Sequence, residues 1–193
     1  MRLFLVLALA VAAVSMTLAQ SSSKQIITTG GNATLPFSPA VKADGLIYVA
    51  GTLGTDATGA IAKGDIKAQT KQTLENISAT LKAGGSTIAN AASVLVYLRS
   101  VSDFAAMNEV YGTFWQKDPP ARTTVIVGQP LANADGLIEI SMVAVPTGGQ
   151  RVVVHPSDWI RSPSPYSYGI KSGNTLFLSG RRPSRSRCPC RCG

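Results

Sequence analysis

The sequence predicts an α+β fold in which two helices lie on one face of a mixed β-sheet. β-prone segments stand at both ends of the region 24–146, two amphipathic helical segments lie between them, and a buried strand separates the helices. A helix–strand–helix order inside a run of strands is accommodated when both helices pack on one side of a single sheet. A region of this length can bury a core of its own.

Three strands are predicted before the first helix. Residues 25–29 form a short β-prone run. Residues 38–42 and 46–50 flank an Asp-Gly pair, which between apolar segments is a strong hairpin signal. The Gly- and Thr-rich stretch 51–64 that follows is expected to be a loop.

The first helix is predicted over 65–83. Asp65 is a suitable N-cap, and Gly84-Gly85 provides an end. Apolar side chains at helical spacing fall on one face of the segment, which is expected to pack on the sheet. They are Ile66, Leu74, Ile77 and Leu81.

A buried strand over 93–99 separates this helix from a second one. Ser102 or Asp103 is expected to cap the second helix, and Pro119-Pro120 ends the region. The apolar face of the helix consists of Phe104, Met107, Tyr111 and Phe114 or Trp115.

Two further strands are predicted at 123–127 and 137–145, and each brings a candidate functional residue. Arg122 opens the first strand, and its guanidinium can hold a small carboxylate bidentately. Glu139 lies in a largely apolar strand, where burying a carboxylate is costly unless it is paired. Two alternatives remain open: the two side chains pair with each other across strands, or Glu139 lies on a solvated face.

The N-terminal end has the features of an export signal. Arg2 precedes an apolar run of about a dozen residues and a small-residue site at Thr17-Leu18-Ala19, which predicts a signal peptide over 1–19 with cleavage after Ala19. The mature protein is then expected to be secreted or periplasmic, without a stable membrane anchor. A membrane span would need about 20 apolar residues.

The C-terminal stretch 181–193 is predicted to be a disordered tail. It holds five Arg and all three Cys, and single residues separate successive Cys. No metal site is expected there, because tetrahedral zinc usually needs wider spacing and a fourth ligand. The net charge of +8 falls to +2 once this tail and the one Arg of the signal segment are removed. A nucleic-acid partner is therefore not expected.

Between the folded region and the tail lies a possible repeat. Residues 147–164 are expected to be a linker or irregular segment, although 151–155 could form a strand. Residues 165–180 resemble 36–51 at a constant offset of 129, with identical Pro, Ser, Lys and Gly at four of sixteen positions. They are predicted to be a partial second copy in a truncated tandem protein. The alternative is a coincidence between two hairpins with the same turn chemistry.

Several common catalytic arrangements are missing from the sequence of the folded region. His155 is the only His in the chain and lies outside 24–146, which rules out a Ser-His-Asp triad or a His metal site within that region. No Gly-rich nucleotide-binding loop is present. We therefore expect chemistry without a cofactor.

The order of these segments and their motifs resembles the RidA/YjgF family, also called the L-PSP endoribonuclease family. The most specific piece is Pro-Ala-Arg-Thr at 120–123, followed by Glu139; Gly51 and the segment 108–114 agree as well. The resemblance implies a chorismate-mutase-like fold and a barrel-like homotrimer with clefts between neighbouring subunits. It also implies hydrolysis of 2-imino acids to 2-keto acids and ammonia.

The resemblance also implies roles for individual residues. Arg122 would hold the substrate carboxylate, and Glu139 would orient water or return a proton to the departing nitrogen. Further substrate-binding positions are Phe37, Gly51, Asn108 and Thr124. Phe37 lacks the hydroxyl of the Tyr common at this place, whereas Tyr166 in the second copy retains it; Thr124 stands where many members have Cys. The alternative functions are a non-catalytic binder of small carboxylated metabolites and, less favoured, a ribonuclease or translation inhibitor.

Overall fold

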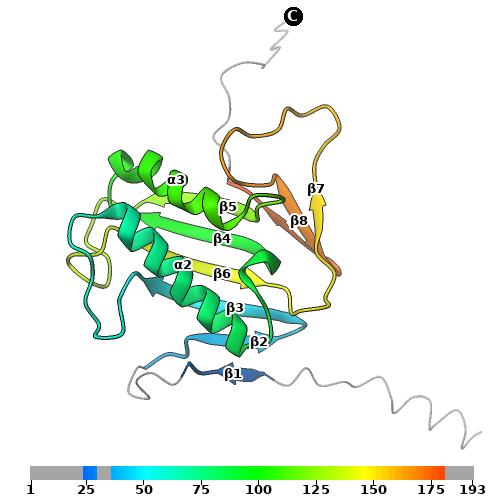
Figure 1. Cartoon of the computed structure of the whole chain (residues 1–193). Helices are drawn as coiled ribbons and strands as arrows, with labels where there is room; N and C mark the ends of the chain where they lie inside the picture. Colours follow the sequence, from blue (N-terminus) through cyan, green and yellow to red (C-terminus); the bar gives the residue numbers. More distant parts are fainter. Residues whose placement is uncertain (1–23, 30–35, 181–193) are drawn as a thin grey trace, which may run out of the picture.

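The computed structural model describes residues 24–29 and 36–180 and confirms the α+β fold class (Figure 1). The predicted signal peptide and the predicted tail lie outside the described residues. A six-stranded sheet forms the centre of the molecule, with the strand order β1-β2-β3-β6-β4-β5. Its strands are β1 (Gln25–Ile27), β2 (Ala40–Ala43), β3 (Leu46–Leu53), β4 (Ala91–Leu98), β5 (Ala121–Ile126) and β6 (Ile138–Ala144).

Both long helices lie on one face of this sheet, as Figure 1 shows. They are α2 (Ile66–Ala83) and α3 (Phe104–Phe114). The predicted N-cap of α2 is confirmed, since the Asp65 carboxylate accepts a hydrogen bond from the Ala68 N–H at 2.9 Å. In the described part of the chain, neither helix is long and apolar enough to cross a membrane.

One of the two predicted N-caps of the second helix, Asp103, is confirmed as the N-cap residue. A short 3-10 turn, η3 (Val101–Asp103), leads into α3, and Asp103 makes no side-chain capping hydrogen bond. Ser100 caps the turn instead by accepting a hydrogen bond from the Ser102 N–H at 3.2 Å. A 3-10 turn thus precedes the α-helix, and the side-chain capping hydrogen bond is made at the start of that turn.

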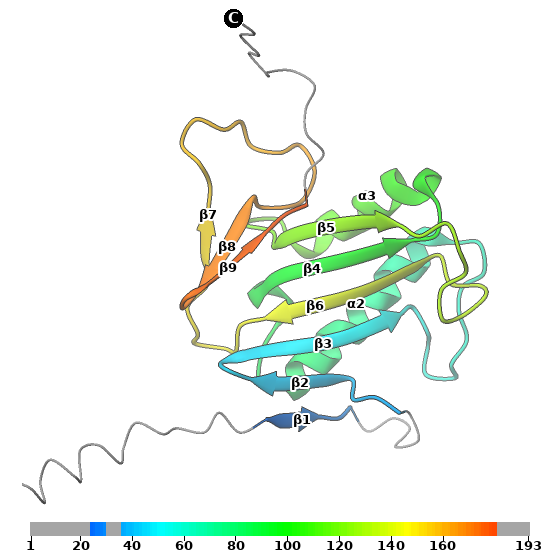
Figure 2. The ribbon, with the colours of Figure 1, turned by 180° about the vertical axis from the view of Figure 1, so that it is seen from behind.

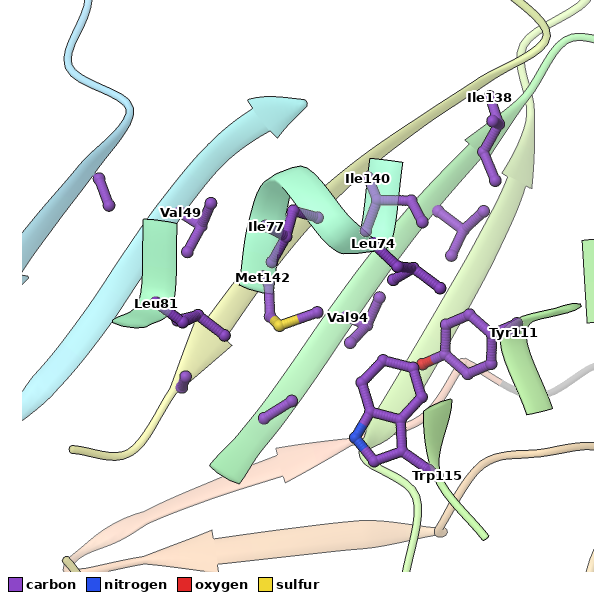
Figure 3. Close-up of a cluster of buried hydrophobic side chains, with 14 of the residues drawn as sticks. Val49, Leu74, Ile77, Leu81, Val94, Tyr111, Trp115, Ile138, Ile140 and Met142 are labelled. Carbon is purple, nitrogen blue, oxygen red and sulfur yellow. The ribbon is translucent and has the colours of Figure 1, made fainter. Parts of the chain in front are cut away.

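A continuous hydrophobic core fills the space between the helices and the sheet (Figure 3). It contains the predicted face of α2, and Leu74, Ile77 and Leu81 are fully buried. β6 alternates strictly between buried and half-buried residues, because alternate side chains of a strand point to opposite faces. Met107, Tyr111 and Trp115 close the core on the side of α3.

The topology separates the two strands that carry the candidate residues. β5 pairs in parallel with β4 and forms one edge of the sheet, whereas β6 inserts between β3 and β4. β5 begins at Ala121, so Arg122 lies inside the strand and does not merely precede it. β4 therefore lies between the strand of Arg122 and the strand of Glu139.

A second sheet follows the six-stranded one in the chain and packs near the start of β4 and β5 (Figure 2). Its strands are β7 (Val152–Val154), β8 (Gly169–Ser172) and β9 (Thr175–Leu178). The predicted linker 147–164 thus contains a strand, as its three consecutive valines allow. Ile170 of the small sheet is fully buried and packs in a hydrophobic cluster with Ala121, Val145 and Ala92.

The small sheet repeats the pairing of the first three strands. Each pair of facing residues in β8 and β9 corresponds to a pair in β2 and β3 at an offset of 129. For example, Val41 faces Tyr48, and Ile170 faces Phe177. β7 pairs antiparallel with the three residues of β8 that correspond to those of β2 paired with β1, but β7 itself follows β1 at an offset of 127 and not 129. A two-residue turn by itself fixes this register, so the partial second copy stays a prediction and coincidence between two hairpins stays the alternative.

Replacing Ile170 by Ala tests the attachment of the small sheet. Such a truncation at a fully buried site is expected to destabilise the packing by about 2–5 kcal/mol. We expect hydrogen exchange to accelerate in β7, β8 and β9 while the amides of β4 and β6 stay protected. Leu178→Ala, at a side chain that is 67% exposed, is the control and should change little. Uniform acceleration throughout the chain would show that the two sheets unfold as one unit.

Candidate functional site

Arg122 lies on the helix face of the sheet, buried beneath α3. It pairs in register with Val94, a core residue on that face. Its guanidinium carbon lies 4.7 Å from the ring centroid of Tyr111 and 5.8 Å from that of Phe104. The side chain is only 4% exposed, and Nη1 has no hydrogen-bond partner among the described residues.

This environment is unfavourable for a cation unless an anion joins it. Burial lowers the pKa of Arg122, although the neighbouring hydroxyls of Tyr111 and Tyr166 act in the opposite direction. An arginine nevertheless stays protonated in proteins, so the charge remains. Cation–π contacts compensate part of the lost hydration, but a buried donor without an acceptor is costly. An anionic ligand at this position would supply the missing acceptor.

A cavity of about 200 Å³ adjoins Arg122. Two parts of the chain line it. From β5 and α3 come Arg122, Thr124 and Phe104; from the C-terminal segment come Ser164, Tyr166 and Gly180. The Thr124 hydroxyl is buried and, like Arg122 Nη1, lacks a partner in the described structure. Two polar groups of one strand are thus unsatisfied at one cavity, which points to a small polar ligand.

A larger cavity, of about 390 Å³, lies beside the C-terminal half of α3. Asn108 lines it, and the Asn108 Oδ1 is buried with no partner among the residues described. Tyr166 lines both cavities, so the two spaces are neighbours. Asn108, Thr124 and Arg122, which the resemblance predicts to bind substrate, therefore lie in one part of the molecule.

Glu139 lies on the opposite face of the sheet from Arg122. It pairs with Tyr97 of β4, three positions from the Val94 that pairs with Arg122, so the two side chains point to different sides. The carboxylate lies over Gly51, where a methyl group would overlap with Glu139 Oε1. Glycine at this position lets the carboxylate lie against the backbone of β3.

Phe37 lies far from Arg122 within one chain. It precedes β2, on the side of the sheet away from β5, and its side chain is 54% exposed. The predicted site residues thus divide into two half-sites: the Arg122 half-site, with Thr124 and Asn108, and the Glu139 half-site, with Gly51. Direct pairing of Arg122 with Glu139 is ruled out within one chain, because β4 separates their strands.

Some residues of the Arg122 half-site were not predicted from sequence. The sequence predicts Phe104 and Tyr111 on the core face of the second helix, where apolar spacing gives no sign of a nearby cation. Ser164 and Gly180 come from a segment distant in sequence. For Tyr166 a signal did exist, because it occupies the place of Phe37 in the repeat and keeps a hydroxyl. Among residues 24–29 and 36–180, no group of His, Cys, Asp and Glu side chains is arranged to hold a metal ion.

Comparison with known proteins finds a matching family profile and several sequence relatives. The sequence profile described as Endoribonuclease L-PSP matches residues 29–146. A RutC family protein of Pyrococcus horikoshii is 46% identical over 110 residues, which cover 56% of this chain and 86% of that protein. The mitochondrial protein mmf2 of Schizosaccharomyces pombe is 40% identical over 110 residues, again covering 56% of this chain and 86% of the relative.

Solved structures agree with these sequence relatives. RidA from the Antarctic bacterium Psychrobacter sp. has a TM-score of 0.58 at 34% identity, covering 63% of this chain and 98% of that one. A structure described as a putative endoribonuclease of Thermotoga maritima has a TM-score of 0.59 at 32% identity, with coverage of 65% and 100%. Both likenesses span nearly the whole of the compared proteins.

A matched pair of arginine substitutions tests whether Arg122 serves a ligand or the fold. Arg151 is half-buried and donates hydrogen bonds to the carbonyls of Ala91 and Asp118, each at 2.8 Å. Arg151→Met should lower the free energy of unfolding by about 1–3 kcal/mol, because two carbonyls lose their donors. Arg122→Met should leave it unchanged or raise it, because the substitution removes an unpaired buried charge.

Urea denaturation of the two variants and the wild type measures the difference. A large loss of stability in Arg122→Met, comparable to that in Arg151→Met, would assign Arg122 to the fold and remove the argument for a ligand.

Proposed function

Because this chain belongs to the RidA/YjgF family, whose profile is the Endoribonuclease L-PSP one, we propose that it binds 2-imino acids through Arg122 and hydrolyses them to 2-keto acids and ammonia. One observation carries the proposal. The buried, charged guanidinium of Arg122, whose Nη1 has no hydrogen-bond partner among the described residues, lies at a cavity of small volume. Such a group is suited to an α-carboxylate, which presents two oxygens in one plane.

The dimensions of the cavity support a ligand of this size. At about 30 Å³ for each water of the liquid, a volume of about 200 Å³ holds a molecule of a handful of non-hydrogen atoms. Bidentate binding at Arg122 would fix the direction of the carboxylate and hence the position of C2. Phe104 offers an apolar surface for a short side chain, and Thr124 offers a hydroxyl.

Hydrolysis requires little further machinery. The imine carbon is already electrophilic, so a water oxygen adds to C2 and the nitrogen takes up a proton. The resulting carbinolamine collapses to the C=O of the keto acid, and the C–N bond breaks to release ammonia. A carboxylate that orients the water and transfers protons contributes about 10²–10⁴-fold in such reactions.

Glu139 is the residue we propose for this role. Within one chain it faces away from Arg122, so it would act at the Arg122 cavity of another copy. The division of the predicted residues into two half-sites supports an assembly that brings the two together. A homotrimer with sites between subunits is the arrangement that we propose.

The second candidate function is binding without turnover. It is favoured by the composition of the Arg122 cavity, whose lining residues include no carboxylate. Such a protein would hold a keto acid or a related carboxylated metabolite and release it unchanged.

The decay of 2-iminobutanoate or 2-iminopropanoate, generated by an amino-acid oxidase, tests both functions. We expect the purified chain to accelerate the decay. Glu139→Gln should lower kcat by about 10²-fold or more, with a small change in KM. Arg122→Lys should mainly raise KM, because an ammonium replaces the bidentate fork.

Arg99→Lys is the matched control for the arginine substitution. Arg99 makes its one described side-chain hydrogen bond to the Ala134 carbonyl and is absent from the lining of either cavity. Activity should be unchanged in this variant. If the wild type binds 2-oxobutanoate but leaves imine decay at the uncatalysed rate, the second candidate replaces the first. If it does neither, the proposed function fails.

A further inference from the structure

The second repeat forms one wall of the Arg122 cavity. Ser164, Tyr166 and Gly180 line the cavity opposite residues of β5 and α3. These wall residues lie at the two ends of the segment that copies the first hairpin in sequence and in register. The cavity is therefore a contact between the first unit and a copy of part of that unit, within a single chain.

Hydrogen bonds hold this wall to β5 on both sides of Arg122. The Ser167 N–H donates to the Pro120 carbonyl at 3.1 Å. The Arg122 N–H donates to Ser179 Oγ at 2.8 Å, and the Gly180 N–H donates to Thr123 Oγ1 at 2.9 Å. An unpaired strand edge is a site for adding another segment, and here the second repeat occupies it.

Apolar contacts also hold the second repeat on the first unit. Ile170 is fully buried against the first unit, and Phe177 packs against the same cluster. Their counterparts in the first repeat are Val41 and Tyr48, and Tyr48 is 43% exposed. The same face of the hairpin is thus covered in the second repeat and open in the first. This is expected if the face is built to dock on a unit of this kind.

In the sequence of the second repeat, Tyr166 occupies the position that corresponds to Phe37 in the first hairpin. Tyr166 lies at the Arg122 cavity, whereas Phe37 is exposed on the far side of the sheet. Likewise, Gly180 corresponds to Gly51. Its backbone lies so close to Thr123 that a methyl group there would meet the Thr123 side chain at 2.8 Å.

We infer that the second repeat completes the Arg122 cavity within one chain, and that the Tyr166 hydroxyl donates a hydrogen bond to the small carboxylate bound there. The nature of the ligand rests on the proposed function. Recognition of the carboxylate then needs no second copy, because Arg122, Thr124 and Tyr166 come from the same chain. The Tyr166 hydroxyl supplies the donor that Phe37 lacks.

Binding of 2-oxobutanoate to the full chain tests this inference. Calorimetric titrations are made at concentrations where sedimentation gives the mass of a monomer. Tyr166→Phe should weaken binding about tenfold, which is the loss of one charge-assisted hydrogen bond. Tyr48→Phe is the matched control, since it removes a hydroxyl outside the cavity, and Phe37→Leu removes the other candidate ring. The Tyr48→Phe control should change the affinity less than about twofold.

Two results would overturn the inference while leaving the proposed function in place. One is weaker binding in Phe37→Leu together with unchanged binding in Tyr166→Phe, because the ring would then come from another copy. The other is wild-type binding that appears only at concentrations where the protein is assembled.

Absence of binding by the wild type would instead defeat the proposed function. Hydrogen exchange at the Arg122 amide then decides whether the second repeat forms the wall. Slow exchange that Ser179→Ala makes fast supports the docked repeat, since the variant removes the acceptor of that amide. Fast exchange in both proteins overturns it.

Discussion

The central constraint in this molecule is a guanidinium that is buried without a counter-ion among the described residues. Arg122 keeps its charge in a setting where burial works against it, and the rings of α3 compensate only part of the lost hydration. A core position on that strand would be more stable with an apolar side chain. The arrangement is understandable if stability at this point is given up for the recognition of an anion. α3 therefore contributes side chains to the hydrophobic core and also covers the Arg122 guanidinium.

The alternation of side chains along strands determines how the candidate residues can cooperate. Arg122 and Glu139 belong to strands separated by β4, and they point to opposite faces of the sheet. No small movement of either side chain brings them together. Under the proposed function, carboxylate recognition and proton transfer would fall to opposite faces of the sheet, and a reaction that uses both would depend on how copies of the chain assemble.

The hairpins β2–β3 and β8–β9 show how the surrounding strands determine which face of a hairpin is buried. β2 and β3 join the large sheet through β6, with Ile47 in the core. β8 and β9 pair in the same register, but the hairpin turns its other face, with Ile170, onto the first unit. A short amphipathic hairpin has two usable faces. Which one is buried depends on the strands that remain unpaired nearby.

Local signals in the sequence determined the elements of this fold. Asp65 and the spacing of Leu74, Ile77 and Leu81 define α2, the Asp-Gly pair defines the first hairpin, and the identical residues at an offset of 129 reveal the second. These features follow from contacts between near neighbours in the chain, so they can be recognised without coordinates.

The tertiary structure alone decided which residues share a site. The insertion of β6 between β3 and β4 places Glu139 on the face away from Arg122, and the docking of the second repeat brings Tyr166 to the guanidinium. Neither is encoded in local spacing, because strand order and edge pairing depend on the free energy of the whole sheet. The sequence identified the candidate residues, and long-range packing determined which residues lie beside them.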